Sequence, residues 1–581
     1  MRLTGPAVVS MMAGMGDLRL LLMHHDDHSR PVLAHGLAAA EVGHARPVDR
    51  GERLDSPHLR SLTSDKNALG KQGYCVIAPL GERGDRLLEL AKPLIDKRRE
   101  DVNRERPADH PEQPINILRV PTLAQMGREP SWDDAVDWVK GNLEKPELEE
   151  QDIPYYRLIL GDLHEVPQTV QQAVTVNGLV GRLAFDRDDD YEAYAAKVLA
   201  SEGGQIPDRW PDVTMYTVRD ETPETEELHR DLTAPTFARL HRNFDLDDWP
   251  HDAHQYVCEP PSPAHLLDCA RTAAGSVLFT LSHGEGAPRD GWRDDHERQR
   301  QFQGAMTFGE GRLCASDVAE GHFLPGGIWF MNACFGAGTP GQSAFLPWLQ
   351  KLADINYQHR DIAQLVRHSL PAAGVPPFIA ALPKAALANP DGPLGFIGHI
   401  DLAWTYGFGD HADRNHGHGK RITVLHGVLS SLSQGQRFGA CFHHLTHYVN
   451  ATIASEFPAV VKQADEHGRI SDPRYLHLWM MSEDLRGYAL LGDPAARILA
   501  PGREPWRNPR PRSIRPLDVF AQGARPVPQR PAIDQLERAI GFVLTGSPVA
   551  KEAQRLQVAE RDLQRWVDRY RDAGKRALQD E

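Results

Sequence analysis

The sequence predicts an α/β fold built on a mostly parallel β-sheet that is covered by helices. From residue 73 onward, short apolar runs typical of buried strands alternate with longer amphipathic runs typical of helices. The alternation occurs twice, which indicates two similar halves in tandem. The chain has 581 residues, 41% of them hydrophobic and 25% charged, so it is long enough to bury large cores and has an ordinary globular composition.

The first half opens with "YCVIAPL" at 74–80, a predicted strand, followed by "GDRLLELAKPLIDKRRE", a predicted amphipathic helix. A second pair follows in "INILRV" at 115–120 and "SWDDAVDWVKGNL", where Ser131 is the expected N-cap. "YYRLILGD" at 155–162 predicts a third strand. "DDDYEAYAAKVLASE" at 188–202 predicts a helix whose first-turn acids suit the positive end of its dipole.

The second half shows the same alternation. One helix is expected near 225–241. The predicted strands lie at 213–218, 276–281, 328–333 and 394–400.

Composition changes mark the flanking segments. The first segment is rich in His, Asp, Arg and Gly without periodicity, so we expect it to be loosely structured or a partial extra layer. A Pro/Arg-rich run near the end has the composition of a stiff, extended linker, and helical patterns follow it. The predicted organisation is an N-terminal extension (1–72), a first α/β subdomain (73–204), a second one with the candidate site (205–500), a linker (501–531) and a helical module (532–581).

Charge and cysteine usage indicate the compartment and exclude some partners. The formal net charge of −15 argues against general nucleic-acid coating or binding to an acidic membrane surface. The six cysteines form no CxxC pair, which favours a reducing cytoplasm over a disulfide framework. The start of the chain is a poor signal peptide, and the apolar run at 372–388 contains three prolines and Lys384. We therefore expect a soluble, cytoplasmic protein with no membrane partner.

Two of the predicted strands end in a reactive side chain followed closely by glycine. "VLFTLSHGEG" at 277–286 delivers His283 and then Gly284, and "IWFMNACFGAG" at 328–338 delivers Cys334. The carboxyl ends of parallel strands meet at one edge of a sheet, so imidazole and thiol are expected side by side. A thiol becomes a useful nucleophile when an imidazole takes its proton, and the backbone N–H groups of Gly284 and Cys334 could bind a developing oxyanion.

The spacing of the two residues strengthens this interpretation. A single His or Cys at a strand end is usually structural. The separation of 51 residues, however, falls at the roughly fifty-residue spacing of caspases, whose thiol lies in Q-A-C-[RQG]-G. The equivalent here is "NACFG", with Asn332 in place of Gln and Phe335 in the position after the thiol.

The sequence resembles caspase-like cysteine peptidases, the clan of caspases, gingipains and CHAT-domain proteases, and most resembles the gingipain family. "YYRLILGDLHEVP" and "VGRLAFDRDDDYEAYAAKVLASE" are similar to the first gingipain subdomain. "GPLGFIGHIDLAW" at 392–404 resembles the strand after the nucleophile, and "YALLGDPAARI" at 488–498 resembles the closing "GDP" segment. The resemblance covers roughly 73–500 and implies a caspase-like (caspase–hemoglobinase) three-layer fold in two tandem subdomains.

The resemblance also implies roles for individual residues. Cys334 would be the nucleophile, His283 the general acid toward the leaving amine, and Gly284 with Cys334 the oxyanion donors. Trp404 would line the S1 pocket. The implied activity is that of a cysteine endopeptidase acting on a protein or peptide substrate, with no cofactor and no metal.

In some family members an acid after the strand at 213–218 orients the histidine, and another binds a P1 arginine. Asp220, nearest the strand end, is our candidate for the orienting acid, and Glu227 and Asp231 are candidates for the pocket base. A basic P1 preference follows, although each acid could equally belong to a solvated helix start. The run "RDETPETEELHRDL" offers Asp220, Glu221, Glu224, Glu226, Glu227 and Asp231.

Two departures from gingipains affect the expected biology. The interval between the thiol and Trp404 holds a helical insertion around 343–370, which could shape the cleft. Secreted gingipains carry a signal and a pro-region, and neither is apparent here. We therefore expect an intracellular, regulated protease, of the kind that acts in bacterial defence or cell death on a protein partner.

The remaining motifs carry weaker signals. Among the histidine-rich runs, His443 and His447 stand four apart on one helix face, but no third metal ligand is placed. "FGAGTPG" lacks the Lys-Ser/Thr of a P-loop. The alternatives to a peptidase are a pseudo-protease scaffold and a DNA-associated regulator.

The tail at 532–581 resembles a helix-turn-helix module. Ser547 is the expected N-cap of its second helix, with Pro548 at the first helical position. Residues 548–581 hold eight Lys/Arg and seven Asp/Glu, a balance that favours a regulatory protein partner over DNA. The apolar face of the third helix consists of Leu563, Trp566, Val567 and Tyr570.

Overall fold

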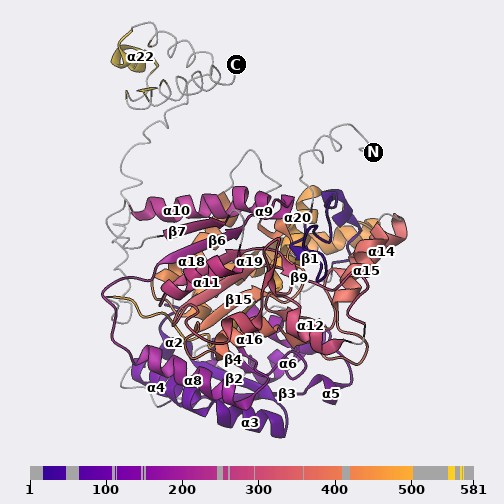
Figure 1. The fold of residues 1–581 in the computed structure, drawn as a ribbon, viewed down its shortest axis with the longest axis vertical. Helices are drawn as coiled ribbons and strands as arrows, with labels where there is room; N and C mark the ends of the chain where they lie inside the picture. Colours follow the sequence, from indigo (N-terminus) through magenta and orange to yellow (C-terminus); the bar gives the residue numbers. More distant parts are fainter. Residues whose placement is uncertain are drawn as a thin grey trace. The chain divides into compact units, whose positions relative to one another are not determined.

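A computed structural model gives the fold of the chain (Figure 1). The chain divides into two compact units, Met1–Trp506 and Arg507–Glu581, and each is described by itself. In the first unit the structure describes residues 18–47, 65–106, 112, 114–145, 148, 152–244, 253–258, 262–293, 295–356, 359–408 and 419–501. In the second unit it describes residues 543, 547–556, 560, 563, 564 and 567.

A ten-stranded sheet forms the centre of the first unit, in the order β3-β2-β4-β5-β16-β15-β12-β8-β6-β7 (Figure 1). All neighbouring strands run parallel except β15 and β16, which are antiparallel. The sheet therefore consists of two parallel halves of opposite direction that meet between β16 and β15. Its strands are β2 (Tyr74–Pro79), β3 (Asn116–Val120), β4 (Tyr156–Leu160), β5 (Leu179–Leu183), β6 (Val213–Val218), β7 (Ala253–Cys258), β8 (Val277–Leu281), β12 (Ile328–Asn332), β15 (Gly395–His399) and β16 (Tyr488–Gly492).

Two small sheets lie outside the central one. The first has the order β1-β9-β10-β11, and the second pairs β13 with β14. Their strands are β1 (Leu22–Met23), β9 (Gly284–Glu285), β10 (Met306–Thr307), β11 (Arg312–Leu313), β13 (Gly338–Thr339) and β14 (Phe378–Ile379).

Helices connect the strands of both halves. In the first half they are α2 (Leu69–Gln72), α3 (Glu82–Leu90), α4 (Lys92–Glu105), α5 (Leu123–Met126), α6 (Trp132–Asn142), α7 (Gln168–Val176) and α8 (Asp188–Glu202). In the second half they are α9 (Pro223–Leu228), the π-helical η3 (His229–Thr233), α10 (Ala234–Phe244), α11 (Pro263–Thr272), α12 (His296–Phe302), α13 (Ala315–Val318), α14 (Leu346–Ile355), α15 (Arg360–Ser369), α16 (Ala381–Ala388), α17 (Thr405–Phe408), α18 (Gly419–Ser433), α19 (Phe438–His467) and α20 (Pro473–Arg486). A 3-10 turn, η1 (Ala39–His44), precedes them all.

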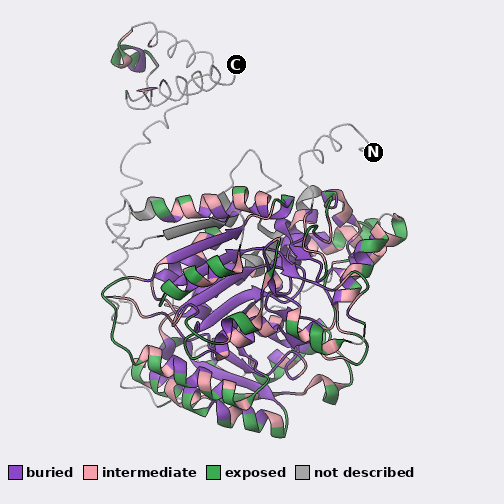
Figure 2. Cartoon of the chain, viewed as in Figure 1, coloured by how far each residue is buried: buried purple, intermediate pink, exposed green. Residues whose placement is uncertain are grey.

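Both faces of the first half of the sheet are covered, because successive side chains of a strand point to opposite faces. In β2, Cys75 and Ile77 join a hydrophobic cluster with residues of α6 and α7. Val76 and Ala78 join the main cluster, to which α3, α4 and α8 contribute. The central strands are buried along their length (Figure 2). This half is therefore a sheet between two helical layers.

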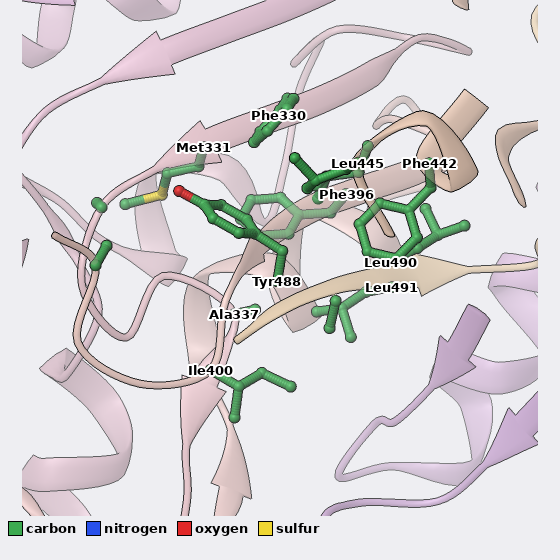
Figure 3. Close-up of a cluster of buried hydrophobic side chains, with 14 of the residues drawn as sticks. Phe330, Met331, Ala337, Phe396, Ile400, Phe442, Leu445, Tyr488, Leu490 and Leu491 are labelled. Atoms are coloured by element: carbon green, nitrogen blue, oxygen red, sulfur yellow. The ribbon is translucent and has the colours of Figure 1, made fainter. Parts of the chain in front are cut away.

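The junction between the two halves is a packed hydrophobic region (Figure 3). The ring of Phe330 in β12 meets that of Tyr488 in β16 edge to face, with 5.8 Å between the ring centroids. The Tyr488 hydroxyl donates a hydrogen bond to Oδ1 of Asn332 at 2.8 Å. Phe442 and Leu445 of α19 cover the same strands (Figure 3). These contacts connect the strand that ends near Cys334 to the first half of the sheet.

The predicted elements are confirmed to within a few residues, with two helices divided. The helix expected near 225–241 forms as α9, the π-helical η3 and α10 in succession. The helix expected to follow β2 forms as α3 and α4, which meet at Ala91 because Pro93 lies in the first turn of α4. Ser131 caps α6 as predicted, and its side chain accepts a hydrogen bond from the backbone N–H of Asp134 at 3.2 Å. The insertion expected at 343–370 forms α14 and α15.

The described residues 18–47 do not have the loose structure that was one of the two expectations for this segment, which leaves the other, a partial extra layer. Leu18 and the residues from Leu20 to Met23 are fully buried in the main core. Leu22 and Met23 form β1, which pairs in parallel with β9. The described residues 18–47 are therefore an integral part of the first unit, because their apolar side chains fill space beside the sheet.

In the second unit, α22 (Val549–Leu556) is the helix expected after Pro548. The hydroxyl of Ser547 donates to Oε1 of Glu552 at 2.8 Å, and Leu563 and Val567 are buried. Trp566, Tyr570 and all but the first residue of the predicted linker lie outside the described residues. Within the described parts of the chain, no helix is both long enough and apolar enough to cross a membrane.

Candidate active site

The register of two neighbouring strands places His283 and Cys334 at the same edge of the sheet. β8 and β12 pair in parallel with Leu281 opposite Asn332, the last residue of each strand. His283 follows its strand by two residues, as Cys334 does. Both side chains are fully buried. The two predicted reactive residues therefore lie next to each other in the fold, at equivalent positions on adjacent strands.

The Cys334 thiol lies against the backbone of Ala403. The Ala403 N–H donates to Sγ at 3.1 Å, and Sγ lies 3.5 Å from the Ala403 carbonyl oxygen. Burial raises the pKa of the Cys334 thiol well above its usual range, so the thiol is protonated in this arrangement. The next residue, Phe335, has a φ of +55°, which is unusual for a residue with a side chain and marks a sharp turn behind the thiol.

A hydroxyl and a carboxylate from the loop after β6 lie beside the imidazole of His283. Nε2 of His283 lies 2.8 Å from the hydroxyl of Thr222 and 3.8 Å from Oδ2 of Asp220. The hydroxyls of Thr222 and Thr225 donate to Oδ1 of Asp220 at 2.7 and 2.8 Å. Because the Thr222 hydroxyl donates its proton to the Asp220 carboxylate, the hydroxyl oxygen can accept a hydrogen bond from Nε2–H of His283. The other ring nitrogen, Nδ1, then carries the lone pair that can take a proton.

Burial lowers the pKa of His283, and the nearby Asp220 carboxylate opposes that shift. Nδ1 of His283 has no hydrogen-bond partner among the described residues. The arrangement thus holds a neutral imidazole whose Nδ1 is available for proton transfer.

Two backbone N–H groups converge on a single carbonyl oxygen, that of Leu21. The N–H of Gly284 donates to it at 3.0 Å and the N–H of Cys334 at 3.2 Å. These are the two groups that the sequence predicted as oxyanion donors. A carbonyl oxygen held by two N–H groups beside a thiol has the geometry that polarises a carbonyl for nucleophilic attack.

Gly284 lies so close to the backbone of Cys334 that no side chain would fit there. A Cβ atom at this position would be 1.8 Å from the carbonyl oxygen of Cys334. Glycine is therefore required here for the close approach of the two strand ends, and this approach aligns the two N–H groups.

The predicted acids occupy two different places. Glu227 lies near Arg19, with Oε2 3.3 Å from Nε, and Glu224, which the sequence did not single out, lies 3.6 Å from the same guanidinium. Asp231 lies farther along in η3 and pairs with Arg230 at 2.7 Å, with one third of its side chain exposed. The structure thus brings Glu224 and Glu227 together around the N-terminal segment and places Asp231 with its own neighbour.

Trp404, the predicted S1 residue, is buried among other aromatic rings. Its ring centroid lies 5.7 Å from that of Phe345 and 5.6 Å from that of Trp348. Its backbone forms an isolated antiparallel bridge with Leu20. Leu20 and its neighbours therefore cover the backbone beside Cys334.

Sequence reasoning missed two residues of this arrangement, Thr222 and Leu21, and left Glu224 as one of six acids among which it did not choose. Thr222 and Glu224 lie in the acidic run already singled out, where a hydroxyl between carboxylates was the available signal. Leu21 lies in "DLRLLLM", an apolar run without any chemical signature.

Comparisons with known proteins identify structural similarity only. No protein-family model and no curated protein matches the chain. The chain is similar to the crystal structure of the Arg-specific cysteine proteinase gingipain R, with 12% identity and a TM-score of 0.39 over 74% of this chain and 78% of that one. It is also similar to the complex of the Porphyromonas gingivalis RgpB pro- and mature domains, with 10% identity and a TM-score of 0.36 over 73% of this chain and 80% of that one.

A third similar structure is the Saccharomyces cerevisiae separase–securin complex, with 10% identity and a TM-score of 0.28 over 64% of this chain and 18% of that one. All three TM-scores are low. We therefore base the functional assignment on the geometry around Cys334.

Proposed function

We propose that the protein is a cysteine endopeptidase with a caspase-like catalytic arrangement, in which Cys334 is the nucleophile and His283 the general acid–base. The observation that carries the proposal is the convergence of the Gly284 and Cys334 N–H groups on one carbonyl oxygen beside the thiol, at 3.0 and 3.2 Å. Acyl transfer requires donors of this kind at the developing oxyanion.

The reaction follows from the positions of these groups. As Sγ of Cys334 attacks the substrate carbonyl carbon, Nδ1 of His283 takes the thiol proton, and the negative charge that develops on the carbonyl oxygen is held by the two N–H groups. The C–N bond then breaks, and Nδ1 delivers that proton to the leaving amine. Water hydrolyses the resulting thioester, which releases a carboxylate and restores the thiol.

In this proposal Asp220 and Thr222 are positioning residues. They hold Nε2 of His283 through the 2.8 Å contact to the Thr222 hydroxyl, which in turn donates to the carboxylate at 2.7 Å. With Nε2 fixed in this way, Nδ1 is directed toward proton transfer.

Thr222→Val, which is nearly isosteric, is expected to lower kcat/KM about 10- to 100-fold. The reason is that a hydrogen bond to a charged group contributes roughly 1.5–3 kcal/mol, and the histidine becomes charged during the reaction. Thr222→Ser retains the hydroxyl and should restore most of the activity. Steady-state kinetics on a peptide substrate measure the effect, and equal losses in both variants would contradict the positioning role.

The proposal is tested with a peptidyl electrophile that captures an activated thiol, followed by mass-spectrometric mapping of the adduct. We expect labelling at Cys334 and not at Cys75 in β2 or Cys441 in α19, because neither of these lies at the strand end beside His283. His283→Ala should slow the labelling, because the thiol then has no partner to take its proton. If Cys334 remained unlabelled by every peptidyl electrophile and no peptide were cleaved, the chain would be a scaffold and not an enzyme.

A further inference from the structure

We propose that the groove beside Cys334 binds an extended peptide with an aliphatic residue at P1 and a basic residue at P3, and that the chain's own Arg19–Leu22 fills it in the manner of a substrate. P1 is the residue whose carbonyl is attacked, and P3 lies two residues before it. This inference rests on the proposed function and adds the substrate class that the same site accepts.

The backbone of Leu21 makes hydrogen bonds, through both its carbonyl oxygen and its N–H, of the kind that position a P1 residue. Its carbonyl oxygen accepts hydrogen bonds from Gly284 and Cys334, and its N–H donates to the Ala403 carbonyl at 3.0 Å. The peptide bond held at the nucleophile is therefore the one between Leu21 and Leu22.

The segment is extended on both sides of this bond. Before it, Leu20 bridges to Trp404 in antiparallel fashion, and the Thr405 N–H donates to the Arg19 carbonyl at 2.9 Å. After it, β1 runs parallel to β9, and the Gly286 N–H donates to the Met23 carbonyl at 2.7 Å. The backbone pairing thus continues across the bond, as an endopeptidase groove requires.

The side chains of Leu21 and Arg19 indicate which substrate side chains the groove accepts at P1 and P3. Leu21 is fully buried in the main hydrophobic core, which fits an aliphatic P1 residue. Alternate side chains of an extended segment lie on the same side, so Arg19 is on the side of Leu21, two positions earlier. Arg19 lies 3.3 Å from Oε2 of Glu227 and 3.6 Å from Oε1 of Glu224. Glu227, one of the two acids that the sequence assigned to a basic P1 residue, therefore serves the P3 position together with Glu224 in this proposal.

Occupation of the groove keeps the site closed. Cys334 and His283 are fully buried while the segment is present. Downstream of β1, His25 pairs with Glu285, and Arg312 pairs with the same carboxylate, so the segment is also held just past the groove. A second peptide can reach the thiol only in the fraction of molecules whose segment has left, and its apparent affinity falls in proportion.

Charge reversal at Arg19 separates the segment from its acids without removing a buried apolar side chain. We expect Arg19→Glu in the full-length chain to increase the rate of Cys334 alkylation by iodoacetamide about tenfold or more over the wild type, because the segment is repelled by Glu224 and Glu227. Arg19→Lys should behave like the wild type. Arg230→Glu is the matched control, since it reverses a charge in η3, directly after the helix that carries Glu224 and Glu227, at a residue that pairs with Asp231. Thermal melting verifies that all three variants are folded.

Substrate selection is measured on the same proteins with fluorogenic tetrapeptides acetyl-Leu-Arg-Leu-Leu, acetyl-Leu-Arg-Leu-Arg and acetyl-Leu-Glu-Leu-Leu. The first should be cleaved about tenfold or more faster than either of the others, and fastest by Arg19→Glu. Preference for the peptide ending in Arg, or equal alkylation of Cys334 in Arg19→Glu and the wild type, would overturn the inference while leaving the peptidase intact. Faster alkylation without cleavage of any peptide would overturn the peptidase, and the assigned substrate class with it.

Discussion

Cys334→Ala is expected to reduce peptide cleavage about a thousandfold or more while leaving the fold intact. The thiol is the nucleophile in the proposed mechanism, and removal of a nucleophile leaves only the contribution of binding and the oxyanion donors. The substitution removes one sulfur atom from a buried position, so the free energy of unfolding should fall by only about 1 kcal/mol. Single-turnover cleavage and urea denaturation measure the two quantities.

Cys441→Ala is the matched control, because Cys441 is also buried but lies in α19, far along the chain from the site. It should lose similar stability and retain full cleavage. If Cys334→Ala retained cleavage, or if both variants lost it equally, Cys334 would not be the nucleophile.

Gly284→Ala is expected to impair both stability and activity. A Cβ atom there would lie 1.8 Å from the Cys334 carbonyl oxygen, and backbone on both sides leaves little room for adjustment. We expect the free energy of unfolding to fall by about 3 kcal/mol or more. Any relief of the clash separates the two N–H donors, which should lower kcat about 100-fold or more.

Gly286→Ala provides the comparison two residues away. Its Cβ would meet Cδ1 of Leu22 at 2.9 Å, the far end of a flexible side chain that can move. The expected loss of stability is therefore smaller, about 1 kcal/mol. Urea denaturation and peptide kinetics on both variants make the comparison, and equal effects would show that the close approach at Gly284 has no special role.

Local patterns predicted most of the architecture. The apolar runs that became β2, β4, β6, β8, β12 and β15 were recognisable because strands buried on both faces have continuous apolar sequences. The placement of His283 and Cys334 on neighbouring strands followed from the same pattern, and the structure has them at adjacent strand ends. Their catalytic roles remain a proposal.

The sequence was least informative where the outcome depends on long-range partners. The apolar residues 20–23, "LLLM", would look the same in any core, so their position beside Cys334 had no local signal. The antiparallel pairing of β16 with β15 joins segments about ninety residues apart in the chain, which periodicity alone does not determine. The composition of the acidic run also does not tell which carboxylate lies beside His283 and which ones pair with Arg19.

The equal offset of His283 and Cys334 from their strands has a consequence for how this chain can change. Their relative position is determined by the pairing of Leu281 with Asn332, and not by the number of residues that connect them. The turn containing Gly309 and Gly311, both at positive φ, lies within that connection. The connection could therefore be lengthened or shortened at this turn over many generations, while the distance between imidazole and thiol stayed the same.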